Sequence, residues 1–322
     1  MVEIHGNESP SLLLSIGLTR SLTRKDMIIT NKHGLPAPFV DAMTMDNYSR
    51  GESDYTTTEL IGPPRIRVLM KRHYDEIEMD VMERVWSMSG SVRHHIFEML
   101  ARKRPERYIA EMRFYLDVGG KKVGGQIDLY DRHDRTLYDW KEVKVWKVQS
   151  NDFTEWEAQA NINSLLCNNA GVYPERLVNI AIMKDWSKSK VRFTKGYPKE
   201  PAKAIPLRYW PWAETMEYLE SRLAVHDAAR DAKEPPLCSP KERWQDPPKW
   251  AAKKKGLKRA LKLYDTEAEA KAHKSTDGKP IEVEFRPSTP KRCIDYCPVK
   301  TFCSFGRQAL KEFNETQQEE ES

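Results

Sequence analysis

The sequence lacks any apolar run long enough to cross a membrane, and its charge is not strongly biased toward one sign. Its 322 residues include 53 Lys and Arg against 48 Asp and Glu, a net charge of +5. The first residues, MVEIHGNESPSLLLSIG, have an acidic start and a very short apolar core, which is not the pattern of a secretory leader. We therefore expect a soluble, cytoplasmic protein with no membrane partner. The mild basic excess is compatible with nucleic-acid binding but does not by itself indicate it.

Cysteine is scarce and its count, five, is odd. Cys293, Cys297 and Cys303 nevertheless crowd into CIDYCPVKTFC, a C-x3-C-x5-C pattern, and Cys238 lies upstream in PPLCSPKERW. In a reducing compartment such crowding favours a metal over disulfides. Four thiolates can hold zinc or a [4Fe–4S] cluster, and a set of free thiols is the alternative. Cys167 lies in the apolar stretch NINSLLCNN and is expected to be a core thiol.

Residue patterns divide the chain into four regions. The first 54 residues have no clear periodicity and predict an N-terminal arm, and residues 55–232 carry the main alternation of helices and strands. A proline-rich break opens a cysteine region at 233–310, inside which 249–287 predicts a small β-β-α-β unit. Residues 311–322 end in NETQQEEES and predict a disordered acidic tail. No long internal repeat is present.

The main region predicts an α/β fold, of the α+β kind, with a mixed central sheet flanked by helices. Apolar residues at helical spacing over 76–103 predict two helices broken near Gly90. From 107 to 148 the period falls to two, which predicts three consecutive antiparallel strands. Helices are expected at 153–171 and 212–232. The apolar strand LVNIAIMKDW lies between them, and KVRFTKGYP is its expected hairpin partner.

Charged residues occur within the predicted hairpin GGQIDLYDRHDRTLYDWKEVKVW. Asp139 and Lys141 are two apart on one strand and therefore point to the same face, and Asp128 lies on the preceding strand. Carboxylates are the ligands that Mg²⁺ and Mn²⁺ prefer, and phosphodiester hydrolysis needs such a metal with a cation beside the developing charge. Two alternatives remain: an exposed hairpin with alternating charges, or a site on the opposite face built from Glu142 and Lys144.

An ordered series of motifs around this hairpin resembles the RecB-like branch of the PD-(D/E)XK nuclease superfamily. The series is GSVRHHIFE, AEMRFYL, GGQIDLYD, LYDWK and EWEAQANIN, over roughly residues 57–170. The N-terminal arm and the stretch around CSPKERW also resemble bacteriophage proteins of this superfamily. The resemblance implies a restriction-endonuclease-like core and a metal-dependent deoxyribonuclease, most simply an exonuclease in phage DNA replication, recombination or processing. A structure-selective endonuclease and a non-catalytic DNA-binding module are the rival functions.

The resemblance also implies residue roles. Asp128 and Asp139 correspond to metal ligands, Lys141 to the catalytic lysine and Gln159 to a residue that supports the site or contacts DNA. Glu111 corresponds to an acidic ligand before the first strand. Glu142 departs from the pattern, because a small or hydroxylated residue often follows the lysine in this branch.

A histidine ligand is implied on the helix before the hairpin. The spacing of Gly90, His94 and Glu98 selects His94, because residues 94 and 98 share a helical face while His95 is rotated by about 100°. A satisfied structural histidine is the alternative. An imidazole ligand makes Mn²⁺ a plausible activator beside Mg²⁺.

Many RecB-like exonucleases carry an iron–sulfur cluster on three C-terminal cysteines and a distant fourth, which favours [4Fe–4S] over zinc here. The distant cysteine precedes the core in those relatives, whereas here Cys238 is the candidate. Expected partners are DNA and, if the phage resemblance holds, a single-strand annealing or recombination protein. KKKGLKR (253–259) is either a DNA-phosphate contact or a solvated hairpin.

Overall fold

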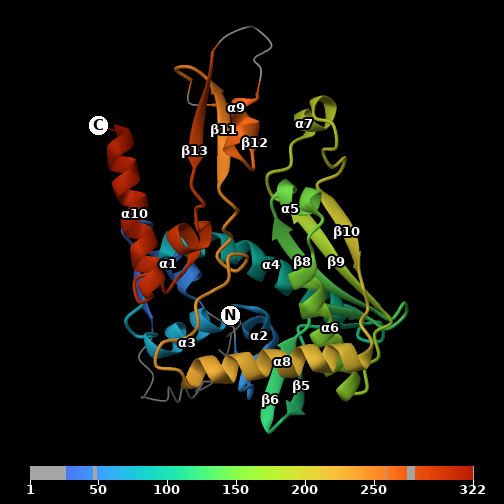
Figure 1. Ribbon diagram of the computed structural model, residues 1–322. Coiled ribbons are helices and arrows are strands. Elements are labelled where there is room, and N and C mark those ends of the chain that lie inside the picture. The colour runs from blue at the N-terminus through green and yellow to red at the C-terminus, as the bar shows by residue number, and fades with distance from the viewer. Residues whose placement is uncertain (1–26, 46–48, 258, 274–279, 322) are drawn as a thin grey trace, which may run out of the picture.

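The structure is a computed structural model that describes residues 27–45, 49–257, 259–273 and 280–321 (Figure 1). The largest sheet among these residues is mixed and has five strands. The strand order is β10-β9-β8-β7-β4, in which β8 and β9 are parallel and the other pairs antiparallel. The strands are β4 (Tyr108–Ala110), β7 (Leu129–Asp131), β8 (Thr136–Val143), β9 (Arg176–Met183) and β10 (Ala202–Leu207). The expected mixed sheet flanked by helices is confirmed.

A second sheet has the order β2-β6-β5, with β2 (Tyr55–Thr56), β5 (Arg113–Val118) and β6 (Lys121–Gln126). The stretches expected as two continuous strands are thus each divided: one becomes β4 and β5, the other β6 and β7. The two halves of each stretch belong to different sheets, so the chain bends sharply at 111–112 and at 127–128. Both bends place acidic residues between the sheets.

Helices pack against these sheets and close the main core. The connection from β8 to the parallel β9 contains α5 (Val145–Ser150) and α6 (Thr154–Asn169), and α6 contributes Ile162 and Leu166, both 0% exposed. Helix α8 (Trp212–Asp231) packs on α3, α6 and α2. Of these helices, α2 spans Thr57–Ile61 and α3 spans Pro64–Arg72. Leu219 and Leu223 of α8 join the same core cluster as α6.

Helix α4 (Val81–Lys103) runs unbroken through Gly90, so the expected break there is wrong. Asp80 caps its N-terminus, with Oδ1 accepting from Met82 N, and Glu83 completes a capping box. The helix packs against β4 and against α1 (Ala37–Thr44), and these contacts offset the cost of an internal glycine, about 1 kcal/mol. Strand β1 (Ile28–Thr30) pairs in parallel with β3 (Glu78–Asp80), which ties the described part of the N-terminal arm to the core.

The connection from β9 to β10 also departs from expectation. Residues expected to form a hairpin strand instead form α7 (Lys188–Phe193), and the partner of β9 is β10. Because β10 occupies the edge of β9, the β-favouring residues Val191, Arg192 and Phe193 are left without that strand to pair with.

The expected β-β-α-β unit is confirmed near the C-terminus. It consists of β11 (Lys249–Lys254), β12 (Ala260–Tyr264), α9 (Glu267–Lys271) and β13 (Ile281–Arg286), with strand order β12-β11-β13. A π-helical turn, η1 (Arg292–Tyr296), leads into α10 (Ser304–Glu321), so the acidic end expected to be disordered is helical as far as Glu321. None of the helices in the described ranges is long and apolar enough to span a membrane.

Candidate metal centre and thiol pocket

The two bends in the strands bring Glu111 and Asp128 together. Glu111 has a φ of 52°, a left-handed conformation that is uncommon outside glycine, and its N–H donates to Asp128 O at 3.3 Å. Ile127 N donates to Met112 O at 3.0 Å, which closes the crossing from the other side. A backbone outlier held by surrounding hydrogen bonds is frequent at functional sites. Here it turns the Glu111 carboxylate toward Asp128.

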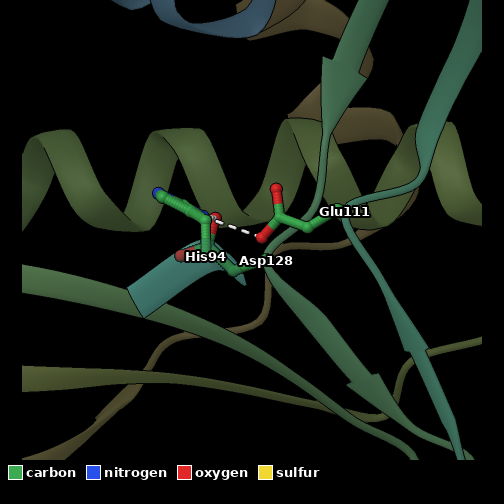
Figure 2. Close-up of side chains that lie close together, drawn as sticks. All are labelled: His94, Glu111 and Asp128. Carbon is green, nitrogen blue, oxygen red and sulfur yellow. Dashed lines mark hydrogen bonds and ion pairs between the residues drawn. The ribbon is translucent and has the colours of Figure 1, made fainter. Parts of the chain in front are cut away.

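His94 of α4 completes a group of three possible metal ligands with these carboxylates. One ligand atom from each of His94, Glu111 and Asp128 lies within 4.8 Å of the others, and Figure 2 shows the side chains turned toward one another. His94 Nδ1 lies 2.7 Å from Glu111 Oε1 and 3.8 Å from Asp128 Oδ1. Neighbouring His95 instead lies 3.5 Å from Glu98 and is exposed. The structure thus brings His94, and not His95, to the acidic residues.

Hydrogen bonds from outside this group orient both carboxylates. Gln126 Nε2 donates to Glu111 Oε2 at 2.7 Å, and Trp140 N donates to Asp128 Oδ2 at 2.9 Å. In each case the other carboxylate oxygen is directed at His94. Outer partners of this kind fix the orientation of metal ligands.

The pKa values of Asp128 and His94 are both raised, because the carboxylates are buried close to one another. Burial first, and then the negative charge of Asp139, raise the pKa of Asp128 to about 7. The hydrogen bond from His94 to Glu111 is the main cause that raises the pKa of His94, and the charge of Asp128 adds to it. A divalent cation would relieve both effects, because its charge favours ionised carboxylates and neutral imidazole.

Asp139, Lys141 and Gln159 form a second group beside the first. Lys141 Nζ donates to Asp139 Oδ1 at 3.1 Å and to Gln159 Oε1 of α6 at 2.8 Å. It also lies 2.8 Å from Asp139 Oδ2, a buried oxygen that accepts no well-directed hydrogen bond from the described residues. The ligand atoms of Asp139 are not within 4.8 Å of all three residues of the first group. Asp139 therefore lies next to the His94 group and not within it.

The opposite face of β8 is occupied by contacts to α4. Glu142 Oε1 accepts from Ser89 at 3.3 Å and lies 3.5 Å from Arg93, while Trp140 packs on Phe97 with ring centroids 3.8 Å apart. Lys144 caps α5 and is exposed. Of the alternative pair, Glu142 therefore contacts α4 and Lys144 faces solvent.

Both groups line one open cavity of about 870 Å³. The cavity also contains residues that the sequence reasoning missed, namely Thr57, Gly125 and Asn163. Thr57 Oγ1 and Asn163 Oδ1 are buried without a partner among the described residues, and a Cβ on Gly125 would clash with both. The adjacent glycines of β6, Gly124 and Gly125, could have indicated this part of the cavity, because a glycine within a strand often marks a place where another group approaches the backbone closely.

Four cysteines line a separate, small pocket about the C-terminal turn. Its walls include Cys238, Cys293, Cys297 and Cys303, and no three of these described sulfurs lie within 4.8 Å of one another. Burial, with the neighbouring Glu242 and the other three thiols, raises the pKa of Cys238 to about 12. Cys167, in α6, has its pKa raised to about 12 by burial alone. The structure thus groups the four cysteines expected as ligands and separates the fifth.

A buried arginine holds the pocket together. Arg65 of α3 is 3% exposed, and its Nε donates to Cys303 Sγ at 3.1 Å. It also pairs with Glu234 and donates to Pro235 O, just ahead of Cys238. Arg243 and Arg292 line the same pocket. Guanidinium groups here would balance the negative charge of thiolates bound to a metal.

The comparisons with known proteins find only distant likeness. No model of a known protein family and no curated protein sequence matches the chain. Among solved structures, it is similar to SSO0001 with a TM-score of 0.42 and 14% identity, covering 61% of this chain and 88% of that one. It is also similar to a phage-related exonuclease from Haemophilus somnus 129PT with a TM-score of 0.28 and 8% identity, covering 43% of this chain and 67% of that one.

Proposed function

We propose that the chain is a metal-dependent deoxyribonuclease of the RecB-like PD-(D/E)XK kind, acting as an exonuclease. The observation that supports this proposal is one cavity that contains the His94–Glu111–Asp128 group beside Asp139, Lys141 and Gln159. Hard oxygen donors, one imidazole and an adjacent ammonium form the set that metal-assisted phosphodiester hydrolysis requires. The exonuclease assignment depends on the motif resemblance, as does the expectation of a phage annealing or recombination partner.

The donor set suits Mg²⁺ or Mn²⁺. His94, Glu111 and Asp128 would hold the ion, and Asp139 beside them would supply a further carboxylate. When bound, the ion supplies a Lewis acid that polarises the scissile phosphate and lowers the pKa of a water ligand. The raised pKa of Asp128 and the close approach of His94, Glu111 and Asp128 both fit such a cation.

The chain's own groups account for the remaining requirements. Lys141 presents an ammonium at the edge of the acidic group, where it can orient the attacking water and stabilise charge on the phosphate oxygens. Gln159 and Asp139 fix the position of Nζ by accepting its hydrogen bonds. Hydrolysis consumes one water, breaks one P–O ester bond and leaves a phosphomonoester and a hydroxyl end.

A [4Fe–4S] cluster on Cys238, Cys293, Cys297 and Cys303 is the second part of the proposal. A tetrahedral zinc site with Zn–S bonds of about 2.3 Å would hold sulfurs about 3.8 Å apart, closer than any three of these lie. The wider spacing and the buried Arg65 suit a larger, negatively charged cluster. Its role would be structural: it would fasten η1 and the 233–238 segment onto α3.

Anaerobically purified protein tests the activity directly. With Mg²⁺ or Mn²⁺, we expect release of nucleotides from end-labelled linear DNA and no cleavage of covalently closed circles. Nicking of the circles would identify an endonuclease. If the protein binds DNA but cleaves no substrate at any tested metal concentration, the nuclease proposal is wrong and the chain is a non-catalytic DNA-binding module.

A further inference from the structure

The connection between β9 and β10 presents a large aromatic side chain to solvent. Phe193, at the end of α7, is 85% exposed, the largest exposed fraction among the large apolar residues of the described chain. Leaving a phenyl ring in solvent forgoes the favourable free energy of burying it. A loop that merely joined two strands would have no need of such a residue at its tip.

The base of this loop is firmly tied to the core. Asp185 Oδ1 accepts from Val145 N at 2.7 Å, and Trp186 Nε1 donates to Pro198 O at 2.9 Å. The hydroxyl of Tyr197 accepts from Ser187 N at 2.9 Å. Trp186 and Tyr197 also pack against the core cluster formed by α5, α6 and the sheet. Phe193 therefore projects from an anchored support.

Basic residues flank Phe193 in the sequence, on α7 and just after it. All of the following are exposed, and none has an ion-pair partner within the ranges that the structure describes: Lys188, Lys190, Arg192 and Lys195. The basic hairpin of β11 is different, because Lys253 lies 2.5 Å from Glu284 and Lys249 pairs with Asp265. The cations around α7 are thus left available, while those two of the hairpin are neutralised within the protein.

A second exposed aromatic residue lies on α5, the helix that follows β8. Trp146 of α5 is 62% exposed and follows Lys141 by five positions, so it lies just past the end of the catalytic strand. Gln149 of α5 donates to Gly196 O at 3.2 Å, which joins α5 to the loop. Figure 1 shows α5 and α7 beyond the same ends of β8 and β9. We call Trp146, Lys188, Lys190, Arg192, Phe193 and Lys195 the α5–α7 surface.

We propose that the α5–α7 surface binds single-stranded nucleic acid. Unpaired bases stack on the rings of Trp146 and Phe193, and the lysines and Arg192 contact the phosphates. Aromatic platforms within a basic track are the chemistry by which proteins hold single strands without sequence preference. This proposal rests on the nuclease function, since it assigns the surface to the strand that enters or leaves the cavity. An anionic membrane could also attract such residues, but Trp146 continues directly from β8, which favours the nucleic acid.

Equilibrium binding of a labelled single-stranded oligonucleotide tests the proposal on the full-length protein, without added Mg²⁺ or Mn²⁺ so that cleavage is avoided. Phe193→Ala should weaken binding roughly five- to 150-fold, the effect of losing one base–aromatic stack. The effect should vanish on an abasic strand of equal length. The matched control is Tyr173→Ala, which removes a ring 56% exposed ahead of the opposite end of β9 and should change nothing.

The cations give an independent measurement. Replacing Lys190 and Arg192 together by Ala should lower the slope of log affinity against log salt by about 1.4, since each single-strand phosphate contact contributes about 0.7. Arg132→Ala, an exposed cation of the β7–β8 turn, should leave the slope unchanged.

Unchanged binding in Phe193→Ala and in the Lys190/Arg192 double variant would overturn the proposal, even if the wild type cleaves DNA. If these variants bind the oligonucleotide normally but no longer bind phosphatidylserine vesicles that the wild type binds, the proposal is overturned and the surface binds membranes instead. If the variants bind the oligonucleotide more weakly but the wild type cleaves no DNA, the result supports the proposed binding surface and contradicts the nuclease function.

Discussion

The metal centre and the thiol pocket are built in opposite ways. The candidate metal centre lies in an open cavity and takes its oxygen and imidazole groups from α4 and the two strand bends, with Asp139 of β8 beside them. The thiol pocket is small and draws its four sulfurs from the C-terminal region, with a buried arginine donating to one of them. An open site can admit a polymer and exchange a labile cation. An enclosed one suits a permanent group that stabilises the fold.

The largest expected effect is on cleavage, at the metal centre. Asp139→Ala should lower the rate by about a thousandfold or more, on the scale of losing a principal electrostatic stabiliser, while DNA binding stays nearly intact because many phosphate contacts share it. Single-turnover cleavage and equilibrium binding measure the two effects. Asp117→Ala, an exposed acid on β5, is the control. Cleavage by Asp139→Ala at the wild-type rate would show that the site is elsewhere.

Lys141 of β8 and Lys144, just after that strand, give the next effect. Lys141→Ala should lower the single-turnover rate by about a hundredfold or more, because Nζ occupies the position between Asp139 and Gln159. Lys144→Ala should change that rate little, since Lys144 is exposed at the start of α5. The reverse ranking would move the site to the opposite face of β8.

Substitutions in the thiol pocket should act on colour and stability. Cys238→Ser, Cys293→Ser, Cys297→Ser and Cys303→Ser should each remove the brown colour and bound iron and lower the melting temperature, because a metal held by the folded site contributes to folding. Cys167→Ala should keep the iron. Absorption spectra and iron and sulfide analysis decide the matter. A colourless wild type with one zinc would replace the cluster by zinc, and iron lost in Cys167→Ala but kept in Cys238→Ser would identify a different fourth ligand.

The smallest expected effect is the pH dependence of the metal-free fold. The folded-state pKa of Asp128 is raised from 3.8 to about 7, so the folded chain retains a proton that the unfolded chain loses in that interval. Stability should therefore fall as pH rises through the interval. His94, whose pKa is also raised, acts with the same sign, while Glu111, Asp139 and Lys141 face the pair.

Thermal melting in buffers without divalent cations measures this slope. Asp128→Asn should flatten it, and Mn²⁺ should raise the melting temperature more at high pH than at low pH, because only the deprotonated site binds the ion. An equally steep slope in Asp128→Asn would assign the titration to other groups.

The sequence predicted the parts of the molecule that depend on local pattern. Alternation over β8 placed Asp139 and Lys141 on one face, and the β-β-α-β unit at 249–287 followed from its turns and its capped helix. The bend at Glu111 was not predictable, because Ala110–Glu111–Met112 contains no glycine or proline to signal a turn. The bend lies where the chain passes from β4 in the five-stranded sheet to β5 in the three-stranded sheet. Helix α4 continues through Gly90 because packing outweighs a local preference, and α7 forms where β10 takes the expected place beside β9.

Metal-dependent cleavage by Asp128→Asn, His94→Ala and His95→Ala, measured together on end-labelled DNA with Mn²⁺, tests the central claim most directly. The Asn side chain keeps the volume of Asp128 but removes its charge, and the two histidine variants differ only in helical face. We predict that Asp128→Asn and His94→Ala lose cleavage while His95→Ala retains it. Wild-type cleavage by Asp128→Asn, or equal losses in the two histidine variants, would contradict the metal centre described here.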